Sequence, residues 1–81
     1  NKKNMNLIGT INVALFGGMG FNINEIKDIM SDISRGWANY DYQIIDQDDF
    51  ADIEIYGIGN EDILYDVLDQ LESEGVDGFI H

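Results

Sequence analysis

The order of hydrophobic patterns along the chain is the feature that most restricts its fold. Over residues 7–16 every second residue is apolar or glycine, and residues 51–58 alternate again. Apolar residues recur at helical spacing over residues 26–37 and 63–71. Because a strand buries every second residue and a helix every third or fourth, these stretches predict strands and helices in turn.

The first half of the chain predicts one strand followed by one helix. The alternate residues expected to face the core are Leu7, Gly9, Ile11, Val13 and Leu15. A glycine-rich stretch ends the strand, because glycine permits backbone angles that other residues resist. Asn22 is then a favoured N-cap, and a glutamate three residues later completes a capping box. The helix is predicted over residues 23–35, with Gly36 as its stop.

The second half predicts two strands, a helix and a last strand. Residues 40–46 and 51–58 have the aromatic and β-branched composition of strands, with a turn between them. Asn60 or Gly59 is expected to cap the second helix. Its apolar stripe consists of Ile63, Leu64, Val67, Leu68 and Leu71. Gly75 should stop this helix, and residues 76–81 form the final strand.

The resulting order, β-α-β-β-α-β, predicts an α+β fold of ferredoxin-like type. Its four-stranded antiparallel sheet would carry two helices on one face. The 81 residues are expected to form a single domain, in which residues 1–6 are frayed or lead into the first strand. This superfold serves many unrelated functions, so the function has to be argued from surface chemistry.

Charge divides the chain into two unequal parts. No lysine or arginine follows Arg35, whereas thirteen carboxylates do, and the net charge is −12. Because like charges repel and cost stability, this excess suggests a basic protein partner. The same charge opposes direct binding to nucleic acid or to an anionic membrane. No apolar run is long enough to span a membrane, so a cytoplasmic location is expected.

The predicted elements place these carboxylates on outer surfaces. If Ile53 and Ile55 pack beneath the helices, their neighbours on the same strand point to the open face of the sheet. Three further acids lie in the turn before that strand, and three line the outer side of the second helix beside a tyrosine. The predicted partner-binding residues are therefore Asp46, Asp48, Asp49, Asp52, Glu54, Tyr56, Asp62, Tyr65, Asp66 and Asp69.

Neither a metal site nor a catalytic site is predicted. An EF-hand loop counted from Asp46 needs glycine at its sixth position and glutamate at its twelfth, where this chain has Ala51 and Gly57. His81 is the sole histidine and the chain has no cysteine. No serine has partners for a catalytic triad. We therefore expect a protein that is not an enzyme and uses no cofactor.

In size, charge and lack of catalytic residues, the chain resembles the small acidic phage-encoded proteins that mimic DNA, including anti-CRISPR proteins. It is also similar in character to the acidic immunity proteins that neutralise nuclease toxins. The resemblance lies in the surface chemistry of Asp46, Asp48, Asp49, Asp52, Glu54, Asp62, Asp66 and Asp69. It implies a viral inhibitor of a basic nucleic-acid-processing protein, such as a CRISPR effector or a nuclease, in the host cytoplasm. Carboxylates would take the place of phosphates.

Two other hypotheses stay open. Gly17, Gly18, Met19 and Gly20 precede a helix N-terminus, a position that can hold anions. The element order resembles that of ACT domains, which use the same loop, and implies a regulatory module that responds to a small molecule. Such a module would form a homodimer through an edge strand. The third hypothesis is a structural subunit whose acidic face keeps it in solution.

Overall fold

Two helices and four strands follow one another in the order predicted from the sequence. The computed structural model describes residues 5–15 and 20–81. Its elements are β1 (Asn6–Ala14), α1 (Ile23–Ile33), β2 (Tyr40–Asp46), β3 (Phe50–Gly57), α2 (Asp62–Ser73) and β4 (Gly78–Ile80). Asn6 already belongs to β1. Residues 1–4 of the segment expected to fray, and Phe16 of the predicted first strand, lie outside the described residues.

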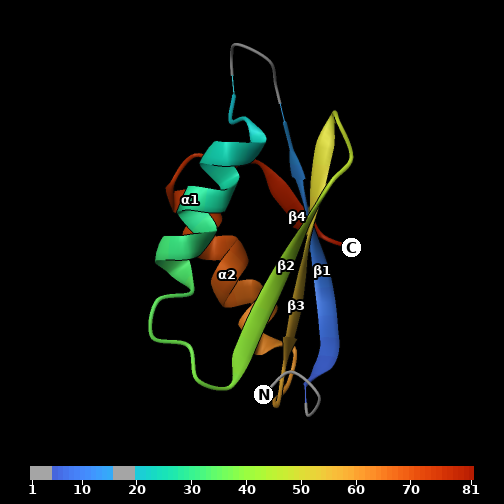
Figure 1. Ribbon diagram of the computed structural model, residues 1–81, viewed down its shortest axis with the longest axis vertical. Helices are drawn as coiled ribbons and strands as arrows, with labels where there is room; N and C mark the ends of the chain where they lie inside the picture. The colour runs from blue at the N-terminus through green and yellow to red at the C-terminus, as the bar shows by residue number, and fades with distance from the viewer. Residues whose placement is uncertain (1–4, 16–19) are drawn as a thin grey trace.

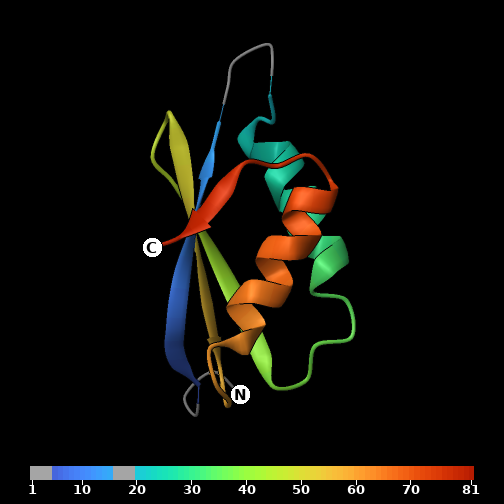
Figure 2. The same cartoon turned by 180° about the vertical axis from the view of Figure 1, so that it is seen from behind.

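The strands form one sheet in the order β2-β3-β1-β4, and every neighbouring pair is antiparallel. Each helix therefore connects two strands that are not neighbours, as in the ferredoxin-like split βαβ arrangement. Both helices lie on the same side of the sheet (Figures 1 and 2). The predicted fold class is confirmed.

The core lies between the sheet and the two helices. Its buried side chains are Ile11, Val13, Ile26, Met30, Ala51, Ile53, Ile55, Leu64, Val67, Leu71 and Val76. They come from β1, α1, β3, α2 and the segment before β4, so every layer contributes. The predicted stripe of α2 is confirmed, since Ile63 and Leu68 also pack against this cluster.

Alternation in β1 is interrupted near its start. Leu7 pairs with Tyr56 and Gly9 pairs with Ile55, so Ile8 is an extra residue in the ladder. A bulge of this kind shifts the side-chain alternation by one position. The prediction that Leu7 faces the core was therefore wrong. Leu7 is 53% exposed and shares the open face with Tyr56.

The helix ends follow from local hydrogen bonds. The predicted capping box is present: Asn22 Oδ1 accepts from the Glu25 N–H over 2.9 Å, and Glu25 Oε1 accepts from the Asn22 N–H over 2.9 Å. The N-cap position of α2 is Glu61, so the prediction of Asn60 or Gly59 was wrong by a residue or two. Asn60 Oδ1 nevertheless accepts from the N–H of Asp62 over 3.0 Å.

Glycines follow both helices, as predicted. Gly36 and Gly75 have φ angles of +86° and +90°, which favour glycine over other residues and turn the chain out of the helix. Within residues 5–15 and 20–81, neither helix has the length and apolar character needed to cross a membrane.

Candidate protein-interaction surfaces

The open face of the sheet carries the predicted strand acids. On β3, Ile53 and Ile55 are fully buried towards the helices. Because neighbouring side chains on a strand point to opposite faces, Asp52 and Glu54 lie on the open face together with Tyr56. The sequence prediction for these three residues agrees with this placement.

Hydrogen bonds fix both central carboxylates of the open face. Nδ2 of Asn12 donates to Oδ1 of Asp52 over 3.0 Å, between neighbouring strands. The Tyr56 hydroxyl donates to Oε1 of Glu54 over 2.9 Å. That bond to Glu54, followed by partial desolvation and the negative charge of Glu54, raises the pKa of Tyr56 above its ordinary value of 10.0. Both carboxylates therefore have a partner that holds them in position.

Large apolar side chains are also exposed on the open face. Leu7, Phe50 and Phe79 are 53%, 38% and 58% exposed. The rings of Phe79 and His81 stack with centroids 6.3 Å apart. From the sequence, Leu7 was expected in the core, and Phe50 and Phe79 were not among the predicted binding residues. Alternation could have indicated Phe50, which lies two residues before Asp52, but the position of Phe79 depends on its pairing with Asn12 of β1.

The turn between β2 and β3 holds three exposed carboxylates, Asp46, Asp48 and Asp49. Oδ1 of Asp46 accepts from the Asp48 N–H over 3.0 Å, and Asp48 has a φ of +71°. The Asp49 carbonyl accepts from the Leu15 N–H over 2.9 Å. The backbone of the turn is therefore hydrogen-bonded internally and to the chain just after β1, and one of these bonds holds the Asp46 carboxylate.

The third acidic group lies on the helix layer. Asp62, Asp66 and Asp69 are exposed on the side of α2 opposite its buried residues, and Tyr65 beside them is 57% exposed. Because the buried residues of α2 pack towards the sheet, this side of the helix faces away from it, and Figure 2 shows α2 on one side of the sheet. The acids of α2 and those of β3 thus lie on opposite sides of a two-layer domain and do not form one surface.

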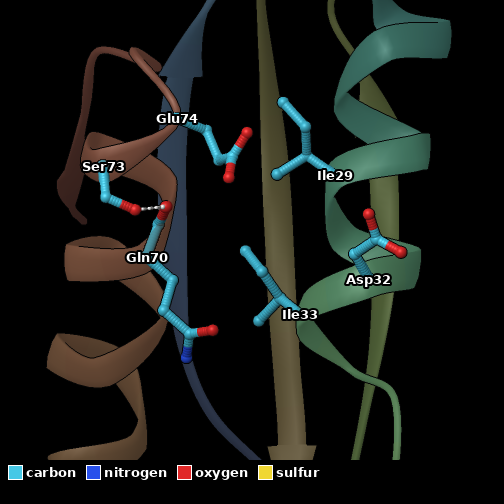
Figure 3. A pocket seen from close by; sticks show the side chains of 6 residues that line it. All are labelled: Ile29, Asp32, Ile33, Gln70, Ser73 and Glu74. Carbon is cyan, nitrogen blue, oxygen red and sulfur yellow. Dashed lines mark hydrogen bonds between the residues drawn. The ribbon is translucent and has the colours of Figure 1, made fainter.

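A narrow groove runs between the two helices. Figure 3 shows Gln70 of α2, and Glu74 just after α2, extending towards Ile29 and Ile33 of α1. Asp32 on its rim pairs with Arg35 over 2.6 Å. The groove has a volume of about 160 Å³. Pockets for drug-sized ligands usually span about 300–1,000 Å³, so this groove is small for such a ligand.

In the part of the chain that the structure describes, no three histidines, aspartates or glutamates gather in a way that could hold a metal ion. Residues 17–19 of the predicted glycine-rich loop lie outside that part, and Gly20 is exposed.

The fold and these surfaces define the class of the protein as an α+β domain of ferredoxin-like topology with acidic groups on both of its outer sides. No protein-family model, curated protein sequence or solved structure matches the chain.

Proposed function

We propose that this chain is a non-enzymatic acidic inhibitor of a basic nucleic-acid-processing protein, such as a CRISPR effector or a nuclease. Its carboxylates would occupy the positions in which the partner binds phosphates. The observation that carries the proposal is the turn between β2 and β3, where Asp46, Asp48 and Asp49 are exposed on a hydrogen-bonded backbone. Groups that are already held in place lose little conformational entropy on binding.

The spacing of the acids supports phosphate mimicry. Asp52 and Glu54 are two residues apart on one strand, a separation of about 6.8 Å along the backbone. Asp62 and Asp66 lie one helical turn apart, at about 5–6 Å. A DNA strand carries one phosphate charge per roughly 3.4 Å of helix axis. The distance between neighbouring carboxylates in each pair is therefore close to twice the spacing of phosphates along a DNA strand. The charge is negative, as a groove of lysines and arginines requires.

The net charge of −12 supports fast association with such a groove. A strong field of one sign steers an oppositely charged partner into contact and accelerates encounter. Salt screens this attraction over about 8 Å at physiological ionic strength. The complex should therefore form quickly and weaken as salt is raised.

The proposal is tested by adding the purified protein to purified enzymes that cut DNA, including an RNA-guided CRISPR effector and a basic nuclease. The expected result is inhibition that saturates at a fixed molar ratio with at least one enzyme. Neutralising the turn with Asp48→Asn and Asp49→Asn should weaken inhibition by about tenfold, which corresponds to about 1.4 kcal/mol of binding free energy.

The matched control is Glu72→Gln with Glu74→Gln, which removes the same charge at the far end of α2, outside the predicted binding set. Equal weakening by both pairs would show that only net charge matters. The proposal is wrong if no enzyme in the panel is inhibited, or if inhibition is indifferent to the turn variants and to salt.

A further inference from the structure

The open face of the sheet has two carboxylates on its inner strand β3 and exposed apolar side chains towards its ends and its β4 edge. Asp52 of β3 pairs with Ile45 of β2 on one side and with Asn12 of β1 on the other. Asn12 in turn pairs with Phe79 of the edge strand β4. One row across the sheet therefore contains Ile45, Asp52, Asn12 and Phe79, in that order. It has an apolar residue at one end, a hydrogen-bonded carboxylate and amide in the middle, and an exposed phenylalanine at the other end.

The same arrangement holds along the strands. Phe50 lies on the same side of β3 as Asp52, at the turn end of the face. Beyond Glu54, Tyr56 pairs with the exposed Leu7 of β1 at the other end. Apolar and aromatic groups thus lie at both ends of the face and next to Asp52 on β2, whereas the cross-strand partners of Glu54 are the polar residues Gln43 and Thr10.

Both helices lie behind the sheet, and no described helix or strand covers this face (Figures 1 and 2). Among the described residues, five large hydrophobic side chains are exposed, and three of them, Leu7, Phe50 and Phe79, are on this face. Exposed apolar groups gathered on one surface mark sites of protein interaction.

We propose that the open face docks a protein segment that places an arginine over Asp52 and Glu54 and apolar side chains on Phe79 and Leu7. This inference rests on the proposed function and names the contact face and the chemistry of the partner. Two fixed carboxylates suit the planar guanidinium, which donates several hydrogen bonds in a set geometry. Apolar side chains of the partner packed on Phe79 and Leu7 would exclude water at both ends of the contact, and exclusion of water strengthens the attraction between opposite charges.

Charge favours this occupant over two others. The aromatic rings of Phe50, Tyr56 and Phe79 could stack with bases, as in RNA-binding domains of this topology, but Asp52 and Glu54 would repel the phosphates. A second copy of the chain would bring another charge of −12 and another pair of carboxylates to the same face. A cationic and partly apolar segment avoids both conflicts.

The experiment follows backbone amide signals of the ¹⁵N-labelled protein during titration with the capped peptide acetyl-Leu-Arg-Leu-Arg-Leu-amide. We expect shifts in β1, β3 and β4 that exceed those of Asp62, Asp66 and Asp69 on α2. The lysine version of the peptide should bind more weakly, and the glutamate version should cause no shifts. Phe79→Ser should weaken binding of the arginine peptide about tenfold.

The matched charge variants are Asp52→Asn with Glu54→Gln on the open face and Asp66→Asn with Asp69→Asn on α2. Only the open-face pair should remove the preference for arginine over lysine. The inference is overturned if the peptide causes no shifts, if the shifts centre on α2 or the turn, or if single-stranded oligonucleotide binds the open face instead.

Failure of this inference can be separated from failure of the proposed function. If the open-face variants inhibit a nuclease as well as the unaltered protein does, while the turn variants do not, the docking face is wrong and the inhibitor function stands. If the unaltered protein inhibits no enzyme, the proposed function fails whatever the peptide does.

Discussion

Asn12 on β1 donates a hydrogen bond from its Nδ2 to Oδ1 of Asp52 on β3, over 3.0 Å and across 40 residues of sequence. The two residues are direct partners in the antiparallel ladder, so their side chains lie side by side on the open face. The bond restricts the rotation of a carboxylate at the centre of that face. It also joins the two middle strands of the sheet through side chains as well as through the backbone.

Removing this bond should cost modest stability. We expect Asn12→Ala to lower the free energy of unfolding by about 0.5–1.5 kcal/mol, the usual net value of an intramolecular hydrogen bond. Urea denaturation of Asn12→Ala, Asp52→Ala and the double variant measures the coupling between the two side chains. A coupling free energy close to zero would show that the bond contributes nothing to the fold.

Close packing between β1 and α2 makes Gly9 sensitive to substitution. A Cβ atom at Gly9 would lie 2.5 Å from Cδ1 of Leu64, so Leu64 would have to move. Gly9→Ala should therefore destabilise the protein by about 1–3 kcal/mol, as overpacking of a core usually does. Thermal unfolding in a Leu64→Ala background is the control, because the added methyl group then meets open space. An equal cost in both backgrounds would contradict the packing explanation.

Tyr56 should make stability depend on pH under alkaline conditions. Its hydrogen bond to Glu54 raises the pKa of Tyr56 above 10.0. Because the pKa in the folded state exceeds that in the unfolded state, the stabilising contribution is fully present below pH 10.0. It is lost as pH rises through the folded-state pKa.

The cause of this shift can be tested directly. Glu54→Ala should bring the pKa of Tyr56 down towards 10.0, as followed by NMR titration of its ring carbons. Asp52→Ala on the same face is the matched control and should leave most of the shift in place. A pKa of Tyr56 that is unchanged by Glu54→Ala would contradict the assigned cause.

Salt should have opposite effects on folding and on binding. Neighbouring acids such as Asp62 and Asp66 lie about 5–6 Å apart, within the screening length of about 8 Å at physiological ionic strength. Their repulsion destabilises the folded chain, so sodium chloride should raise the melting temperature while it weakens the complex with a basic partner.

Circular dichroism over a sodium chloride series measures the effect on folding. Asp66→Asn with Asp69→Asn should reduce the gain in melting temperature, because part of the repulsion is already removed. A melting temperature that is constant or falls with salt would mean that the acids do not repel appreciably in the folded state.

Much of the fold follows from local signals in the sequence. The capping box of Asn22 and Glu25 starts α1 as predicted, and Gly75 with its positive φ follows the end of α2. On β3, the alternation of Ile53 and Ile55 with acids correctly indicated which side chains are buried. These features depend on residues that are close together in the sequence, so they can be predicted from the sequence alone. Element ends were less exact, as the N-cap of α2 at Glu61 shows.

The candidate site depended more on contacts between distant segments. Leu7 has the pattern of a core residue, yet the bulge at Ile8 places it on the open face. Phe79 reaches the same face because β4 pairs with β1 beside Asn12.

By itself, the sequence determined the order of the elements, their buried sides and the acidity of their outer sides, because these depend on short-range periodicity and composition. Only the tertiary structure decided which acids share a surface. The register of β1, β3 and β4 brings Asp52 and Glu54 onto the same face as the exposed Leu7 and Phe79, and the packing of α2 on the other side of the sheet separates Asp62, Asp66 and Asp69 from them. Strand pairing and layer packing join residues far apart in the chain, and local periodicity does not specify those partners.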